Sequence, residues 1–154
     1  MIPAWVRWGS LALAVVSLLA SVYLAVSQVA QTPLACPSSG ALDCAKVTSS
    51  TYSTVAGVPV AYGGVAWSVL MTVLCLPWAW SRKLHLSRLL VALVGFVSVL
   101  YLVWAEIMLG ALCLWCTLVH VSVVGLSAAA AAGWVLDTPR TTSSSSPEVA
   151  QERA

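Results

Sequence analysis

The chain has 154 residues, of which 60% are hydrophobic and only 8% carry a charge. A soluble domain usually has about 25% charged residues, so most of this surface is not expected to face water. The formal net charge of +2 is too small to indicate nucleic-acid binding. Composition therefore predicts an integral membrane protein.

Apolar runs along the chain are long enough to cross about 30 Å of hydrocarbon as helices. Four such runs lie at roughly 10–29, 63–80, 89–109 and 114–136. They predict an all-α integral membrane fold, a four-transmembrane-helix bundle in one domain (1–137) with a long outer loop between helices one and two. The Ser/Thr-rich remainder, 138–154, has no periodic pattern of apolar residues and is expected to be a disordered cytoplasmic tail.

Basic residues predict the orientation, because Lys and Arg concentrate in cytoplasmic loops. Six of the seven lie before the first helix, between the second and third, or after the fourth: Arg7, Arg82, Lys83, Arg88, Arg140 and Arg153. Both termini should therefore be cytoplasmic. The loops before the second and fourth helices should face the extracytoplasmic side.

Four of the five cysteines fall in these two outward segments, where disulfides persist. Cys36 and Cys44 lie in the first loop with seven residues between them, and Cys113 and Cys116 form a Cys-Leu-Trp-Cys motif where the fourth helix starts. A helix N-terminus lowers a thiol pKa and so increases the reactive thiolate. The second pair is therefore suited to redox exchange, whereas Cys75, inside the second helix, is expected to be a packing residue.

Two other interpretations use the same cysteines. All four outward thiols could complete a zinc site, which needs four ligands. Alternatively, the loop pair could form a purely structural disulfide beside an idle Cys-x-x-Cys. Both describe a structural or zinc-binding tetraspan membrane protein, whereas the redox interpretation needs no metal.

The order of the motifs resembles the vitamin K epoxide reductase family, especially its bacterial members without a fused thioredoxin-like domain. Cys-x7-Cys is followed by Lys46-Val-Thr-Ser-Ser, then by Gly57-Val-Pro, a glycine that opens the second helix, and a Cys-x-x-Cys at the last helix. The resemblance covers roughly residues 10–136. Another four-helix family of quinone-linked disulfide generators has its Cys-x-x-Cys in the first outer loop, which is the reverse of the order here.

The resemblance implies a quinone-dependent, disulfide-forming oxidoreductase of the cell inner (plasma) membrane that serves exported proteins. Cys113 and Cys116 match the active-site pair, with Cys116 facing the quinone. Cys36 and Cys44 match the shuttle pair, with Cys44 forming a transient bridge to Cys113. The implied electron donor is a separate thioredoxin-fold (DsbA-like) extracytoplasmic protein, and the implied acceptor is menaquinone, ubiquinone or phylloquinone.

Further residues are expected near the quinone. Ser50, six residues after the second loop cysteine, matches a family serine at this site, and His120 stands where vertebrate members have a tyrosine. His120 also shares a helix face with Cys116, and an ionisable group inside a membrane helix is usually functional; a packed histidine is the alternative. Glu106 is expected to be a solvated interfacial carboxylate or, alternatively, a proton relay, and Trp115 is expected to pack or to shape the pocket.

Overall fold

The computed structural model describes residues 3–36 and 40–137, so the predicted tail at 138–154 lies outside it. Within these residues the long helices are α1 (Ala4–Ala30), α3 (Val60–Cys75), α4 (Arg82–Leu109) and α5 (Leu114–Asp137). The segment between α1 and α3 holds the short helix α2 (Cys44–Thr48), the 3₁₀ turn η1 (Thr51–Ser53), and the strands β1 (Thr54–Val55) and β2 (Val58–Pro59). A second 3₁₀ turn, η2 (Pro77–Ala79), precedes α4.

Three helices, α1, α4 and α5, are long and apolar enough to cross a membrane. The remaining long helix, α3, is apolar but has 16 residues, so it is about 24 Å long against about 30 Å of hydrocarbon. It ends earlier than the expected residue 80 because Pro77 forces Leu76 out of the helical region, to φ −55° and ψ 140°. Three of the four expected spans are therefore supported by length and composition.

The start of α4 also differs from the sequence expectation. Arg82 begins this helix, seven residues before the expected start at residue 89, so Lys83 and Arg88 are helical and do not lie in a loop. Arg88 is moreover only 1% exposed. Its guanidinium donates to the carbonyls of Leu74 and Ala79, which explains why a charged residue is stable inside the bundle.

Small residues let α1 pack closely against its neighbours α3 and α5. Its buried positions recur every three or four residues and include Ser10, Ala14, Ser17, Ser21 and Leu24. The hydroxyls of Ser17 and Ser68 hydrogen-bond across the α1–α3 interface at 3.0 Å. Interfaces of small residues with a hydrogen bond between the helices are typical of helix pairs in membranes. The exposed faces of the helices carry Val, Leu and Trp, which suits contact with lipid.

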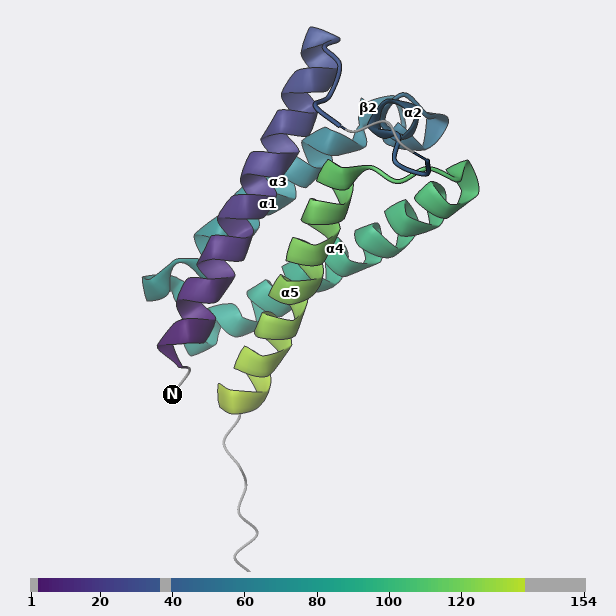
Figure 1. Cartoon of the computed structure of the whole chain (residues 1–154). Helices are drawn as coiled ribbons and strands as arrows, with labels where there is room; N and C mark the ends of the chain where they lie inside the picture. Colours follow the sequence, from purple (N-terminus) through teal and green to yellow (C-terminus); the bar gives the residue numbers. More distant parts are fainter. Residues whose placement is uncertain (1–2, 37–39, 138–154) are drawn as a thin grey trace, which may run out of the picture.

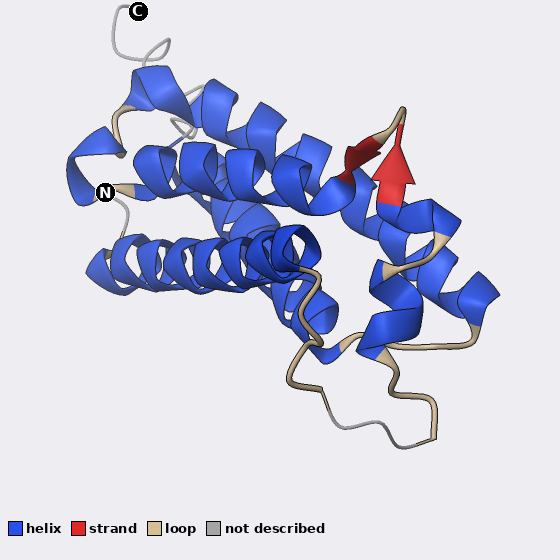
Figure 2. Cartoon of the chain, turned by 90° about the horizontal axis from the view of Figure 1, so that it is seen from above, coloured by secondary structure: helices blue, strands red, loops and turns tan. Residues whose placement is uncertain are grey.

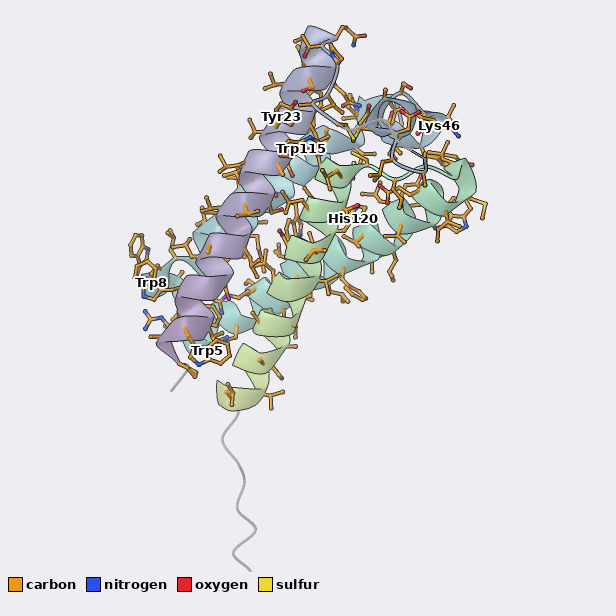
Figure 3. The ribbon with its side chains drawn as sticks, viewed as in Figure 1. Trp5, Trp8, Tyr23, Lys46, Trp115 and His120 are labelled. Carbon is orange, nitrogen blue, oxygen red and sulfur yellow. A yellow bond between two sulfur atoms is a disulfide. The ribbon has the colours of Figure 1, made fainter. Side chains whose placement is uncertain are left out.

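The two ends of the bundle carry different features. In Figure 1 the start of α1 and the end of α5 lie at one end, whereas α2 and β2 lie at the other, toward which α4 leans away from α1. Figure 2 shows both strands and the long outer loop at the end remote from the N-terminus. Trp5 and Trp8 are exposed at the N-terminal end (Figure 3), as expected of aromatic residues at a membrane interface.

The strands form a tight antiparallel hairpin that leads into α3. Val55 pairs with Val58, and the two residues between them, Ala56 and Gly57, have φ values of 52° and 79°. Positive φ at both positions is the requirement of a two-residue type I′ turn. Pro59 ends the hairpin and occupies the N-cap position of α3, so the hairpin leads directly into this helix.

Candidate active site

Backbone hydrogen bonds join the outer loop to the segment that precedes α5. The Leu112 N–H donates to the Ala41 carbonyl at 2.8 Å, and the Asp43 N–H donates to the Leu112 carbonyl at 3.0 Å. The two segments thereby form a parallel bridge. Cys44 comes shortly after the bridge in the loop, and Cys113 comes directly after it in the segment before α5. The two cysteines pack in one buried cluster.

The outer pair, Cys36 and Cys44, is disulfide-bonded, with Cα atoms 6.1 Å apart. This is the pairing that the family resemblance implied. Cys44 is only 2% exposed, whereas Cys36 is half-buried. A thiolate that arrives from outside therefore reaches the sulfur of Cys36 more readily than that of Cys44.

Cys113 and Cys116 are free thiols in different surroundings. Cys113 lies just before α5 and is fully buried against the outer loop, whereas Cys116 is in the first turn of α5 and lines a cavity. The Cys116 N–H donates to the Cys113 Sγ at 3.4 Å. Hydrogen bonding from the Cys116 side chain lowers the pKa of the Cys113 thiol, which burial alone would raise. Cys113 is therefore the more thiolate-like of a buried pair at a helix start.

A cavity of about 510 Å³ lies beside Cys116, among α1, α3, α4, α5 and the outer loop. Its walls are mainly Val, Leu, Ala and Trp side chains, and its polar lining includes Ser50, Tyr52, Glu106 and His120. Apolar pockets of about 300–1,000 Å³ with a few convergent polar groups are typical small-molecule sites. The cavity can therefore hold an apolar ligand in contact with one thiol of the Cys-x-x-Cys.

Glu106 connects the Cys-x-x-Cys to His120 through its two carboxylate oxygens. Oε1 accepts a hydrogen bond from the Cys113 N–H at 3.3 Å, and Oε2 lies 4.0 Å from His120 Nδ1. Glu106 is 5% exposed, so the expectation of a solvated carboxylate is wrong. The cause is a Schellman turn at the end of α4, where Gly110 has φ 61° and Ala111 N–H donates to the Glu106 carbonyl, folding the chain back over the side chain.

The other predicted residues separate into two groups. Ser50 lines the cavity together with His120, and its hydroxyl donates to the Val47 carbonyl at 2.8 Å, which leaves its lone pairs for a ligand donor. Trp115 does not line the cavity. Its ring packs against Tyr23 with centroids 4.6 Å apart, and Figure 3 shows this pair away from His120, where α1 approaches the start of α5.

Gln28 is a cavity residue that sequence reasoning missed. Its Nε2 donates to the Thr48 carbonyl at 3.1 Å, whereas its buried Oε1 has no hydrogen-bond partner among the described residues. Only its polarity within the apolar run of α1 could have singled it out. A ligand hydroxyl in the cavity would satisfy this oxygen.

The zinc interpretation conflicts with this geometry. It needs four thiolates, but two of the sulfurs are bonded to each other in the Cys36–Cys44 disulfide. Within residues 3–36 and 40–137, no group of three or more His, Cys, Asp or Glu side chains is placed to hold a metal ion. The same four cysteines instead form two neighbouring pairs, one disulfide-bonded and one with free thiols.

The family comparison agrees with this arrangement. Residues 8–131 match the model of the vitamin K epoxide reductase family, a range that includes the four paired cysteines, Ser50, Glu106 and His120. No curated protein matches the chain. Family membership makes the chain an oxidoreductase of the membrane disulfide type, and its apolar helices fit a lipid bilayer. The chain therefore belongs to the vitamin K epoxide reductase family.

Proposed function

We propose that the chain takes electrons from the dithiol of a separate thioredoxin-fold, DsbA-like protein outside the cytoplasm and passes them to a membrane quinone. The observation that carries the proposal is the order of the four cysteines in space. Cys36 is accessible, Cys44 and Cys113 share one buried cluster, and Cys116 lines the apolar cavity. Electrons that enter at the first cysteine thus have a continuous thiol route to the cavity.

The inward transfer is a series of thiol–disulfide exchanges. A partner thiolate attacks Cys36, forms a mixed disulfide and releases the Cys44 thiolate, which attacks Cys113 of an oxidised Cys113–Cys116 bond and displaces the Cys116 thiolate. The partner's second thiolate then displaces Cys36 and leaves as a disulfide. The freed Cys36 thiolate attacks Cys44, which restores the outer disulfide and leaves the inner pair reduced. The resulting redox state is the one described above, with a bonded outer pair and a free inner pair.

The cavity beside Cys116 suits a quinone by its size and its chemistry. A bound quinone supplies an acceptor for two electrons and two protons. The apolar walls would bury its ring, while neutral His120 can donate to a carbonyl oxygen of the quinone. The Ser50 oxygen, whose hydrogen is donated to Val47, can accept from a hydroxyl of the quinol. Menaquinone, ubiquinone and phylloquinone share a dicarbonyl ring and an apolar tail, and the proposal extends to each of them.

Glu106 and His120 are the proposed carriers of the protons that the two thiols release on oxidation. The Glu106 carboxylate contacts the Cys113 backbone and lies 4.0 Å from His120. Both side chains line the cavity. The Glu106 carboxyl is therefore placed beside the Cys-x-x-Cys turn, where it can take up a proton that a thiol releases and pass it toward His120 and the cavity.

We further propose that α3 completes a four-helix domain in the cell inner (plasma) membrane. Arg7 belongs to the end where α1 starts and α5 finishes, while the outer loop lies at the opposite end (Figure 1). A cytoplasmic location of the basic end follows the positive-inside tendency. The cysteines then face the extracytoplasmic side, where disulfides persist.

The first test is quinol formation by the purified protein in lipid nanodiscs, with reduced thioredoxin as the donor and each quinone in turn as the acceptor. Wild type and the Cys75→Ala variant, which removes the cysteine outside the site, are expected to turn over. The Cys116→Ala variant should be inactive. Quinol formation at the wild-type rate by Cys116→Ala would contradict the proposal, as would an inactive wild type that is folded and has its thiols intact.

A further inference from the structure

Ala35, the residue before Cys36, is held at both of its backbone groups by aromatic side chains. The Ala35 N–H donates to the Tyr23 hydroxyl at 3.0 Å, and the Trp115 Nε1–H donates to the Ala35 carbonyl at 3.0 Å. The two rings pack against each other at 4.6 Å, with 52° between their planes. Tyr23, Ala35 and Trp115 thus form a three-membered contact, named here the aromatic clamp.

The clamp acts on a segment that has little structure of its own. Residues 32–36 lie outside any helix or strand, and Ala35 itself is exposed. Tyr23 comes from α1 and Trp115 from α5, which are long helices packed against each other. The position of the Cys36 end of the disulfide is therefore set by two rigid elements and not by the loop.

The two ends of the disulfide are held in different ways. Cys44 is held from its other side by the backbone bridge and by its own helix α2, whose N-cap Asp43 accepts from the Lys46 N–H. Trp115 lies inside the Cys113-Leu-Trp-Cys116 motif. The clamp thus ties the accessible end of the outer disulfide directly to the turn that carries the inner pair.

We propose that Tyr23 and Trp115 are positioning residues that keep Cys36 within reach of Cys44 while electrons pass inward. This inference rests on the proposed function. The clamp matters most after Cys36 has been freed from the partner, when Cys36 is in no disulfide bond and its thiolate must return to attack Cys44 of the Cys44–Cys113 bond. A loosened clamp lets Cys36 move away, so that the Cys44–Cys113 bond persists.

Two variants remove one hydrogen bond each and keep an aromatic ring. Tyr23→Phe loses the acceptor for the Ala35 N–H, and Trp115→Phe loses the donor to its carbonyl. Tyr101→Phe and Trp8→Phe are the matched controls, since Tyr101 is exposed on α4 and Trp8 is exposed at the opposite end. Equal thermal unfolding temperatures of all four variants would establish that the fold is kept.

The measurement is a single turnover without quinone, so it does not depend on the identity of the acceptor. Fully oxidised protein is mixed with reduced thioredoxin, quenched by alkylation at set times, and its disulfides are identified by mass spectrometry. Both clamp variants are expected to resolve the Cys44–Cys113 bond about threefold to tenfold more slowly, which is the effect of one lost hydrogen bond. The double variant should be slowed by less than the product of the two single effects, because both side chains hold one residue.

Resolution at the wild-type rate in both single variants would overturn the proposal. It would also be overturned if the Cys44–Cys113 bond did not accumulate in them although total exchange was slower, because that result would indicate a general structural effect. A wild type that exchanges thiols normally but makes no quinol would contradict the proposed acceptor and leave the clamp result valid.

Discussion

Both ends of the bundle bury a cysteine beside an ionisable side chain, and at one of these ends the ionisable side chain lines a cavity. At the end of α3, Cys75 and Arg88 are 0% and 1% exposed. At the other end, Cys113 and Glu106 are comparably buried, yet Glu106 lines a cavity of about 510 Å³. The difference lies in how fully the polar atoms are bonded to the protein itself.

The Arg88 end is closed by backbone carbonyls. Its Nη2 donates to Leu74 and Ala79 at 2.8 and 2.9 Å, and its guanidinium carbon lies 4.0 Å from the centre of the Trp80 ring. Leu74 is in the last turn of α3, where carbonyls lack partners within the helix. Arg88 therefore acts as a cap on α3, whereas Glu106 still has a free face toward the cavity.

The largest difference between the ends should appear when each cysteine is removed. Cys113→Ala is expected to lower quinol formation about a thousandfold or more, because the relay of four cysteines then lacks its third member. Cys75→Ala should keep turnover close to wild type, since no step uses this thiol. If both variants lost activity to the same extent while remaining folded in the nanodisc, the proposed difference between Cys113 and Cys75 would be contradicted.

Removing the cap should affect stability and not chemistry. Arg88→Ala leaves buried carbonyls of α3 and η2 without donors, and we expect a loss of about 3 kcal/mol in the free energy of unfolding. Urea or SDS unfolding monitored by circular dichroism measures this loss, and turnover per folded molecule should be unchanged. Lys83→Ala is the control, because Lys83 is exposed on the first turn of the same helix; an equal loss there would contradict the capping role.

The cysteine motifs and the family could be predicted from the sequence. The cysteine motifs are local patterns, and the family assignment they suggested is confirmed. The Cys36–Cys44 bond in the structure is the one the resemblance implied. The partner, the quinone and the role of each residue remain predictions.

Tertiary contacts account for what the sequence could not predict. Burial of Glu106 depends on the turn at Gly110, and burial of Arg88 depends on carbonyls that only the folded end of α3 supplies. The contact between Tyr23 and Trp115 joins residues on different helices, so no local pattern could indicate it. Hydropathy likewise located the second apolar run but not its interruption before Pro77.

A smaller effect is expected at the end with the cavity, when the ionisable carboxyl of Glu106 is replaced by an amide. Glu106→Gln keeps an oxygen that can accept from the Cys113 N–H but cannot take up and release a proton. Turnover should fall about tenfold to a hundredfold, at the lower end of general acid–base effects, and its dependence on pH should change shape. Wild-type turnover and an unchanged pH profile in Glu106→Gln would remove Glu106 from the proton route.

The smallest effect concerns the acidity of Cys113. Hydrogen bonding from the Cys116 side chain is the largest cause of its lowered pKa, so a residue that can donate at position 116 should preserve the thiolate. Cys116→Ser keeps a donor and Cys116→Ala removes it, and in the Cys75→Ala background Cys113 is the one free thiol in both proteins. Ultraviolet titration of the thiolate should therefore show Cys113 ionising at lower pH in the serine variant than in the alanine variant. Coincident titration curves would assign the lowering to the backbone N–H groups at the start of α5 instead, and the two thiols of the motif would then be electrostatically independent.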